Sequence, residues 1–500
     1  MSISKFYRDR TETFLTPMET LTHLPLHSTI PSLTVVALYF LVLFYLGFRG
    51  FKKTKTFGDY IIGGRKLGAL VGALNVGASD MSSWLLMGLP GAFYLFGFNQ
   101  VWMVLGLILG SFLSWSLLAV RLRLESEKFG NSLTISQFLS NRFNDKSGAL
   151  GLTLSAIIIF FFTIYIASGF VGGAKLFSQF LQISYHKALL FSCVAIVLYA
   201  LVGGFLAVSW ADLFQGLLML FVLLFAPIYI LLNSDLEVFW QSLQAASTHH
   251  LDPFYQLNFW AILGSLSWGL GYFGQPHIIS KYMAIKGPRQ INLAKKICLS
   301  WMSLSMLGAA SVGIIGFVYF LPQKLAEPET VFIALTSKIF HPIFLGLFIA
   351  AILAAIMSTI NAQIIICASA LTQDFYQKFF HKKASDSQML NASRAFVLLV
   401  ALAALAIAWD ENSSVLALVA RAWAGLGAGI GPVIIFALFS KKVTKNAAFC
   451  GVISGAISAL IFSQFKFFSY EILPAFLLSS AVIFLVSFVD FLRRKNFRDF

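Results

Sequence analysis

Charged side chains are scarce in this chain. They make up 11% of its 500 residues, whereas apolar side chains make up 58%. A soluble domain carries about 25% charged residues, and the apolar residues here stand in long runs rather than in short amphipathic stretches. The composition therefore excludes a large soluble core and indicates a protein that lies within a membrane.

Several marks of catalytic or metal chemistry are also missing. The sequence has no nucleotide-binding loop, HExxH pair, Ser-His-Asp pattern or paired-carboxylate site, and the glycine pattern at 269–274 lies in an apolar run rather than after a strand. We therefore expect neither an enzyme nor an ATP-driven pump, and no organic cofactor. The cysteines are far apart without metal-ligand spacing, and we expect them to be small buried residues: Cys193, Cys298, Cys367 and Cys450.

Acidic residues are few, with 21 Asp and Glu against 36 Lys and Arg. A basic surplus can indicate nucleic-acid binding, but here the basic residues gather in short loops between apolar runs, so we expect no nucleic-acid partner. Cytoplasmic loops of membrane proteins are rich in Lys and Arg. The alternation of loop charge therefore predicts an inner-membrane protein with a periplasmic N-terminus and a cytoplasmic C-terminus.

Apolar windows of about 20 residues, the length that crosses a bilayer, predict an all-α polytopic protein with about 13 transmembrane helices. Three of the windows are too long for one straight span, which predicts tilt, a break or a continuation beyond the lipid: 67–96, 149–182 and 340–372. The remaining windows are 31–49, 99–120, 186–204, 207–232, 257–277, 295–320, 394–409, 414–439, 446–464 and 471–492.

The expected organisation is simple. A polar N-terminal arm (1–30), which lacks the apolar core of a signal peptide, precedes a single transmembrane domain (31–492). A short cytoplasmic tail (493–500) follows it. No loop is long enough for a separate soluble domain.

An acid stands inside the second predicted span, in the stretch 77–84. A carboxylate at membrane depth is costly unless it is hydrated, paired or bound to a cation. Gly77 before Asp80, and the Leu89-Pro90-Gly91 step after it, disfavour a continuous helix, and an unwound turn would free carbonyl oxygens that suit Na⁺. The stretch predicts a cation and substrate site at a broken helix. The alternative is a protonated Asp80 packed between helices.

Two adjacent hydroxyls, Ser358 and Thr359, lie in the ninth predicted span. Such hydroxyls commonly bond carbonyls of their own helix, which is the ordinary interpretation. Together with three carbonyls, some of them from a break elsewhere, the two hydroxyls would form an oxygen cage for Na⁺.

Aromatic residues follow one another where the seventh predicted span is weakened by glycines and Pro276. Trp268 and Tyr272 share a helix face and can wall a small apolar ligand. The alternative is an interfacial aromatic belt, and His277 is expected to be an interfacial polar residue. Tyr165, in the fourth span, faces either a cavity or a neighbouring helix.

Two further ionisable residues leave alternatives open. Asp212, near the start of the sixth span, either guards a cytoplasmic ion exit or caps the helix start. Arg421, inside the eleventh span, either snorkels outward or pairs with a buried acid.

Together these stretches resemble the sodium:solute symporter family, and within it the members that transport proline. The resemblance runs in order from about residue 33 to 490. The stretches that carry it are 59–65, 77–91, 161–165, 203–210, 268–277, 352–359 and 422–425.

The resemblance implies a leucine-transporter-like fold of two inverted five-helix repeats, at approximately 67–232 and 257–439. It also implies sodium-coupled import of L-proline by alternating access, with Na⁺ as the coupling ion and no obligate protein partner. The implied Na⁺ ligands are the backbone oxygens of Ala78, Met81 and Ala355 and the hydroxyls of Ser358 and Thr359.

Further roles follow from the same resemblance. Asp80 is the acid needed for effective Na⁺ coupling, Asp212 lies on the inward path of the ion, and Arg65 supports transport at the cytoplasmic side. The implied proline pocket consists of Ser82, Trp84, Tyr165, Trp268, Tyr272 and Pro276, with Ser83 and Gln275 beside them.

The sequence departs from the family pattern in three places. Ser83 stands where a Gly is usual, Arg421 stands where a Tyr is expected, and the N-terminal arm has no counterpart. Because the Ser83 hydroxyl would narrow the pocket, a symporter for another small amino or carboxylic acid is the alternative. A solute receptor that does not transport is a more distant one.

Overall fold

The computed structural model describes most of the chain, and the described residues are almost entirely helical. They contain no β-strand, only an isolated bridge between Leu67 and Ile285, so the all-α prediction is confirmed. The N-terminal arm up to residue 25 and parts of two motif stretches, 59–61 and 203–204, lie outside the described residues. The described ranges are 26–53, 62–202, 205–246, 249–321, 323–381, 383–465 and 470–496.

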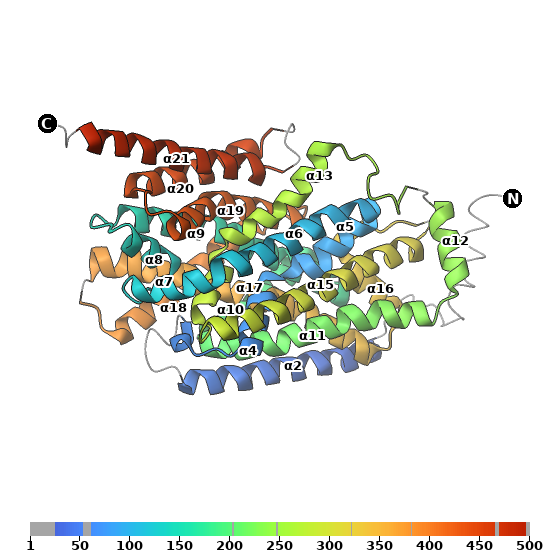
Figure 1. Ribbon diagram of the computed structural model, residues 1–500. Helices are drawn as coiled ribbons and strands as arrows, with labels where there is room; N and C mark the ends of the chain where they lie inside the picture. The colour runs from blue at the N-terminus through green and yellow to red at the C-terminus, as the bar shows by residue number, and fades with distance from the viewer. Residues whose placement is uncertain are drawn as a thin grey trace.

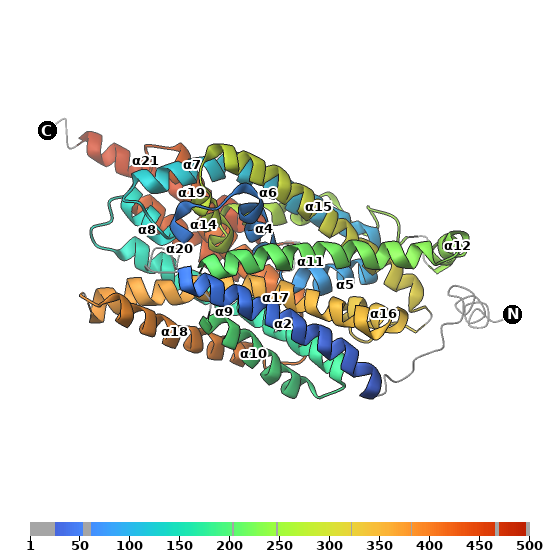
Figure 2. The ribbon, with the colours of Figure 1, turned by 90° about the horizontal axis from the view of Figure 1, so that it is seen from below.

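The long helices lie roughly along one common axis and form an elongated bundle (Figures 1 and 2). In chain order the helices before the middle of the sequence are α2 (Leu26–Lys53), α4 (Ala69–Asp80), α5 (Leu89–Phe96), α6 (Val101–Ser114), α7 (Val120–Lys128), α8 (Ile135–Arg142), α9 (Ala149–Leu181), α10 (Tyr185–Val202), α11 (Phe205–Leu232) and α12 (Leu236–Ala246). Those after it are α13 (Phe259–Leu266), α14 (Pro276–Ala284), α15 (Pro288–Tyr319), α16 (Val331–Ile339), α17 (Pro342–Ala370), α18 (Asp386–Ile407), α19 (Val415–Phe439), α20 (Lys445–Phe462) and α21 (Ile472–Asn496).

Ten helical segments of the described chain are long and apolar enough to cross a membrane. A multi-pass membrane protein is therefore confirmed. The count of about 13 remains a prediction, because α10 is a shorter apolar helix and the predicted spans 67–96 and 257–277 are each divided into several pieces.

Three short helices were not predicted: α8, α12 and α16. Each is too short to span a bilayer and falls in a connection between apolar windows. α12 stands across one end of the bundle (Figure 1). It exposes Leu236 and Trp240, one turn apart, beside the acid Glu237, a pattern typical of a helix at a membrane surface.

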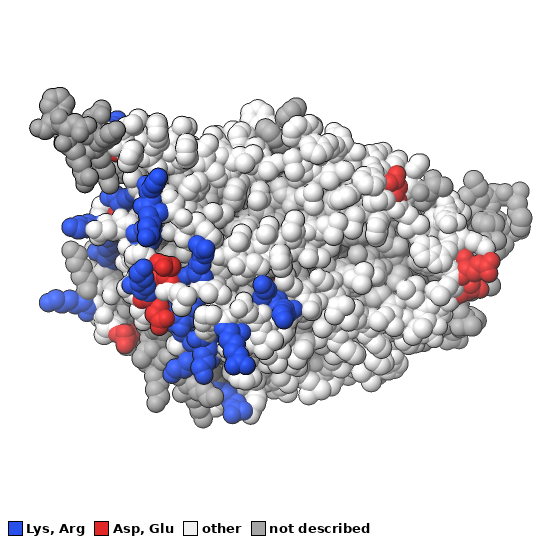
Figure 3. Space-filling model, viewed as in Figure 1, with Lys and Arg blue, Asp and Glu red and all other residues white. Residues whose placement is uncertain are grey.

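Most of the charge on the face in Figure 3 lies at the two ends of the bundle. On this face (Figure 3), Lys and Arg gather at one end with a few acids among them, further acids lie toward the other end, and the surface between is almost free of charge. Large apolar side chains such as Leu41, Val194 and Leu402 are exposed. An uncharged belt rich in exposed apolar side chains suits lipid rather than water.

The second predicted span is broken, as expected, but at one place only. α4 ends at Asp80, and Met81 has a non-helical backbone (φ −85°, ψ 79°). Beyond the break, a π-turn (η2, Trp84–Gly88) leads directly into α5. The expected interruption at Leu89-Pro90-Gly91 is wrong, because the π-turn places Pro90, which has no N–H to donate, at the start of α5.

The other two overlong windows are not broken. α9 is one helix of 33 residues. α17 continues into a π-helix of 10 residues, η7 (Leu371–Phe380), at the basic end of the bundle. Most side chains of α17 are buried, so this helix lies at the centre of the fold.

An ion pair joins two long helices at the acidic end. Lys175 of α9 lies 2.8 Å from Glu329 in the short helix η6 (Pro328–Thr330). The Glu329 carboxylate also accepts hydrogen bonds from the backbone N–H groups of Val415 and Leu416 at the start of α19. One carboxylate therefore neutralises a buried ammonium and caps a helix N-terminus.

The Glu329→Gln substitution should destabilise the protein. Burial raises the pKa of this carboxyl, but Lys175 and the backbone donors outweigh burial, and the pKa lies below its ordinary value of 4.5. The stabilisation is therefore present above pH ~4.5 and lost as the pH falls through the folded pKa. We expect the free energy of unfolding to fall by ~2–3 kcal/mol. This is less than the ~3–5 kcal/mol expected when a buried charge loses every partner, because Glu327 stays 3.2 Å from Lys175.

Thermal unfolding in detergent at pH 7 would measure this loss. Glu327→Gln is the matched control, because the Glu327 side chain is 45% exposed against 10% for Glu329 and should contribute only ~0.5 kcal/mol. Equal, small shifts in the two variants would contradict the role assigned to Glu329.

Candidate functional site

Helices α4 and α17 meet at the break in the second span. The Ser358 hydroxyl of α17 donates to the Ala78 carbonyl at 2.7 Å and lies 3.2 Å from the Ala355 carbonyl of its own helix. The next hydroxyl, Thr359, is buried and has no hydrogen-bond partner among the described residues. The structure thus brings Ala78, Ala355 and Ser358 together, and Met81 stands at the break itself.

The break explains why the Ala78 carbonyl is available. In a continuous helix this carbonyl would accept a bond from the N–H of Ser82. Here the Ser82 N–H donates instead to the Asp80 carbonyl at 3.1 Å. The Ala78 oxygen therefore turns to Ser358, and carbonyl and hydroxyl oxygens converge in a buried place. Such neutral oxygens suit an alkali cation.

Asp80 connects the break to a second interrupted helix. Its side chain is 2% exposed, and one carboxylate oxygen accepts a short hydrogen bond from the Tyr272 hydroxyl at 2.5 Å. The other oxygen has no partner in the described part of the chain. The Trp84 indole donates to the Asp80 carbonyl at 3.1 Å, so the turn that follows α4 folds back over this residue.

The weakened seventh span contains a 3₁₀ segment, η5 (Ser267–Phe273), between α13 and α14. Its backbone leaves helical geometry at Gly274 and is extended at Gln275 (φ −83°, ψ 106°). A glycine is required where η5 meets α19, because a Cβ at Gly271 would lie 1.8 Å from the Trp423 indole nitrogen.

Trp423 contacts each part of this aromatic segment. Its indole N–H donates to the Trp268 carbonyl at 2.8 Å, and its ring meets the Tyr272 ring edge-on at 5.1 Å. The Gln275 side chain donates to the Trp423 carbonyl at 3.1 Å. Tyr272 is buried and Trp268 half-buried. The interfacial-belt alternative is therefore wrong for Tyr272, whose hydroxyl reaches Asp80 inside the bundle.

The interfacial position expected for His277 is also wrong. His277 is fully buried, and its ring lies 5.2 Å from the Phe162 ring and 5.8 Å from the Tyr165 ring of α9. The Tyr165 hydroxyl is buried without a hydrogen bond of normal geometry among the described residues, and its neighbours are Asp80, Ser82 and Trp84 at the break. Of the two alternatives for Tyr165, a side chain that faces a cavity is therefore favoured over one that bonds a neighbouring helix.

Ser83 contacts the neighbouring helix α9. A Cβ built on Gly172 would lie 2.8 Å from the Ser83 Cβ, so the serine fits because α9 has a glycine opposite. The Ser83 hydroxyl is buried without a hydrogen-bond partner in the described chain.

Asp212 forms a buried ion pair instead of a helix cap. It lies two turns inside α11, and the Lys281 ammonium of α14 is 3.2 Å from its carboxylate. The Ser79 hydroxyl donates to the same oxygen at 3.0 Å, and Lys281 also contacts that hydroxyl and the Asn75 carbonyl. Because Lys281 falls between the apolar windows 257–277 and 295–320, the alternation of loop charge predicts a cytoplasmic loop position for it. That placement is wrong, since only 3% of the residue is exposed.

Arg65 lies at the basic end and joins three segments. It is buried, and its guanidinium donates to the Ser132 carbonyl, the Ser126 hydroxyl and the Met283 carbonyl at 2.7, 3.0 and 3.0 Å. Arg421, in contrast, is exposed on α19 and interacts electrostatically with Glu471 ahead of α21. Of the two alternatives for Arg421, a side chain that extends outward is therefore favoured over one that pairs with a buried acid.

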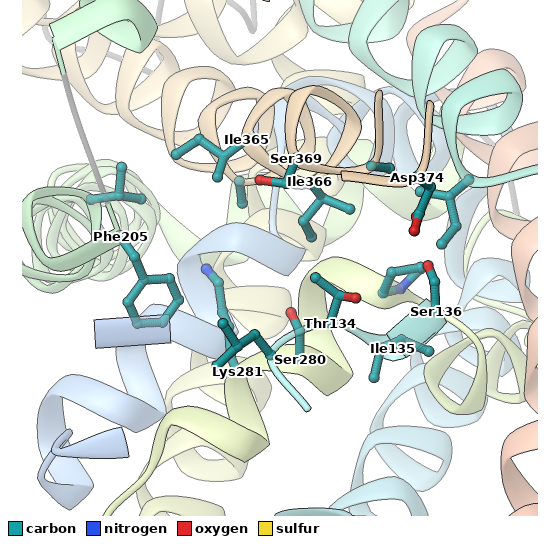
Figure 4. A pocket seen from close by; sticks show the side chains of 16 residues that line it. Thr134, Ile135, Ser136, Phe205, Ser280, Lys281, Ile365, Ile366, Ser369 and Asp374 are labelled. Carbon is teal, nitrogen blue, oxygen red and sulfur yellow. The ribbon is translucent and has the colours of Figure 1, made fainter. Parts of the chain in front are cut away.

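A cavity lies beside α14, α17 and η7 (Figure 4). α14 contributes Pro276 and Lys281 to its wall, and η7 contributes Asp374, whose carboxylate contacts the Ser155 hydroxyl. Hydroxyls of Thr134, Ser136 and Ser369 and apolar side chains such as Phe205 complete it. Pro276, which belongs to the predicted solute pocket, therefore also lines this cavity.

These features define a class of protein. Irregular backbone at membrane depth is tolerated only where it is buried or lines a cavity, and two interrupted helices that meet beside an acid are typical of ion-coupled secondary transporters. The chain belongs to the sodium:solute symporter family, whose family model matches residues 60–455.

Curated relatives agree with this assignment. The chain is 42% identical over 469 residues to the sodium/proline symporter of Escherichia coli (strain K12), which covers 91% of this chain and 93% of that protein. It is 41% identical over the same length to the sodium/proline symporter of Salmonella typhimurium, and 40% to that of Staphylococcus aureus.

Solved structures show the same fold. A Na⁺-coupled sialic acid symporter, in a substrate-bound outward-open state, superposes with a TM-score of 0.76 at 18% identity over 92% of this chain and 98% of that chain. A nucleobase-cation-symport-1 family transporter matches with a TM-score of 0.51 at 12% identity, over 86% of this chain and 95% of that chain.

Sequence reasoning missed Trp423, Tyr470 and Lys281. Trp423 belongs to the motif stretch 422–425, but the sequence pattern assigned it no role. Tyr470 stacks on Trp268 from a distant part of the chain. For Lys281 a signal existed: it is a single basic residue in the otherwise largely apolar stretch 278–285.

Two changes at the break should separate ion binding from folding. Asp80→Asn removes the charge but retains an acceptor for Tyr272, so we expect weaker activation of transport by Na⁺. The double substitution Ser358→Ala with Thr359→Val removes both hydroxyls and should abolish the activation of transport by Na⁺. The measurement is the Na⁺ concentration for half-maximal solute uptake. Ser393→Ala, which removes a buried hydroxyl on α18, is the control, and normal Na⁺ dependence in the first two variants would exclude the site.

Proposed function

We propose that this protein is a sodium-coupled symporter that imports L-proline across the bacterial inner membrane by alternating access. One observation carries the proposal: the Ser358 hydroxyl meets the Ala78 carbonyl that the break in α4 leaves without its helical donor. The family and the names of relatives at 40–42% identity support sodium as the ion and proline as the solute.

The ion would be held by neutral oxygens. The ligand set comprises the backbone oxygens of Ala78, Met81 and Ala355 and the hydroxyls of Ser358 and Thr359. Without an ion the Ser358 hydrogen points to a carbonyl; with Na⁺ bound, the hydroxyl would turn its lone pair toward the ion and leave that carbonyl free to bind it. Asp80, buried nearby with one unpartnered oxygen in the described chain, supplies the charge that favours a cation here.

The solute would lie between the two interrupted helices. Its carboxylate would meet backbone N–H groups at the turn Ser82–Trp84, which lies at a helix start, and its ring would lie against Trp268 and Tyr272. Tyr165, Gln275 and Pro276 complete the proposed pocket. Ser83, which packs toward α9, is the residue that favours the second candidate, another small amino or carboxylic acid.

Two features support the proposed topology of about 13 spans with inverted repeats at 67–232 and 257–439. The first span of each proposed repeat is interrupted, at Met81 in one and at η5 in the other, which is the pattern of paired broken helices in repeat transporters. The gathering of Lys and Arg at one end (Figure 3) supports a cytoplasmic C-terminus and a periplasmic N-terminus.

A single Na⁺ per solute is energetically sufficient. One charge moving down about 100 mV supplies ~2.3 kcal/mol, and a tenfold sodium gradient adds ~1.4 kcal/mol. The sum supports an accumulation of roughly 500-fold.

Uptake by purified protein tests the proposal. In proteoliposomes with an inward Na⁺ gradient and an interior-negative potential, radiolabelled L-proline should accumulate, because both gradients drive the ion inward. With K⁺ replacing Na⁺ on both sides, uptake should fall to the level of protein-free vesicles. Unlabelled amino and carboxylic acids in excess would identify the solute class.

The outcomes separate the alternatives. Accumulation of a different acid, with proline unable to compete, would overturn proline as the solute but retain sodium coupling. Saturable proline binding without accumulation above equilibrium would indicate a receptor and overturn transport itself.

A further inference from the structure

Tyr470 reaches the aromatic segment from outside both proposed repeats. It stands between α20 and α21, and its ring stacks on the Trp268 ring with centroids 4.5 Å apart and planes 21° apart. Its hydroxyl donates to the Ala420 carbonyl of α19 at 2.9 Å, and the residue is 5% exposed. A buried tyrosine with a satisfied hydroxyl is a fixed surface rather than a mobile cover.

The helix that follows holds this tyrosine in place. A Cβ at Gly427 of α19 would lie 2.7 Å from the Ile472 side chain of α21 and 2.9 Å from the Gly271 Cα of η5. At Gly431, one turn on, it would lie 2.8 Å from the Phe476 ring. α19 is therefore in close contact with η5 and α21 at the same level, and the start of α21 has little freedom to shift.

Trp268 is held at two points as a result. Its carbonyl accepts the bond from Trp423, which fixes the backbone, and Tyr470 covers one face of its indole, which fixes the ring. The residue remains only half-buried. An aromatic ring supported on one face presents the other as a rigid, flat surface.

We propose that Tyr470 is a positioning residue for solute recognition, which fixes the Trp268 indole at the distance that suits a compact five-membered ring. The inference rests on the proposed function, in which the solute ring lies against Trp268. It assigns to the segment after α20, outside the repeats, a part in selecting the solute by ring size.

A loosened indole should bind proline less well and reject larger rings less well. In Tyr470→Leu the stacking surface is lost, so we expect the KM for proline to rise about 3- to 10-fold, with kcat within about twofold. The ratio of inhibition constants for the six-membered homologue, piperidine-2-carboxylate, and for proline should fall toward one. The Na⁺ concentration for half-maximal uptake should stay unchanged, because α4 and α17 are untouched.

Three variants make the test specific. Tyr470→Phe keeps the stack and the packing of α21 and loses only the bond to Ala420, so its KM should stay within about twofold of the unmodified protein and its ring-size ratio should be unchanged. Tyr185→Leu is the matched control, because the Tyr185 hydroxyl also donates to a backbone carbonyl, that of Ala408 at 2.8 Å, but its ring packs edge-on against His186 rather than stacking on Trp268. Tyr470→Met, with a long flexible side chain, replaces the Leu variant in the same assay if the latter does not reach the membrane.

The outcomes are distinguishable from those of the proposed function. A raised KM and an altered ring-size ratio in Tyr470→Leu, absent from Tyr185→Leu, would support the inference. A fall in kcat or protein amount alone, with KM and ratio unchanged, would show a merely structural role and overturn it. If the unmodified protein accumulates no proline, the proposed function fails, and that result does not depend on Tyr470.

Discussion

The fold depends on a backbone carbonyl that has lost its own helical partner. At membrane depth no water is present to satisfy such a group, and an unpaired one is costly. The Ala78 oxygen is satisfied only because α17 presents Ser358 at 2.7 Å. The break in α4 therefore requires α17 beside it, and a central helix with nearly every side chain buried follows from that requirement.

The same break also joins the two halves of the molecule. Asp80 leaves α4 at the point where the helix ends, and its carboxylate meets Tyr272 of the second interrupted segment. In the proposed mechanism, a change at the sodium site would reach the proposed solute pocket through this one hydrogen bond. The coupling would be reciprocal: an ion that favours one arrangement of Asp80 and Tyr272 would strengthen solute binding, and the solute would strengthen ion binding equally.

Sequence predicted the features that a single segment determines. Apolar run length fixed the class, and an acid with neighbouring glycine located the break at Asp80. Features that join distant segments were not visible. Lys281 looked like a loop charge because its partner Asp212 lies about 70 residues earlier, and His277 looked interfacial because its cover comes from α9. The π-turn before Pro90 was missed for another reason: its five residues are all apolar or glycine, so a single wide turn cannot be recognised from the hydrophobic pattern there.

The two buried acids of the core are electrically unequal, and this difference bears on where a cation would bind. Asp212 faces the Lys281 ammonium at 3.2 Å, so the pair carries no net charge and attracts a further cation weakly. Among the described residues, Asp80 accepts a side-chain hydrogen bond from the neutral Tyr272 hydroxyl and forms no ion pair, although Lys281 acts on it from a greater distance. In a low-dielectric interior the unneutralised carboxylate dominates the local field. The field therefore favours a cation at the break in α4, beside the Ser358 oxygens, rather than at Asp212. In the proposed mechanism, Lys281 would have to move away before Asp212 could bind an ion, so passage of the ion toward the basic end would be linked to displacement of α14.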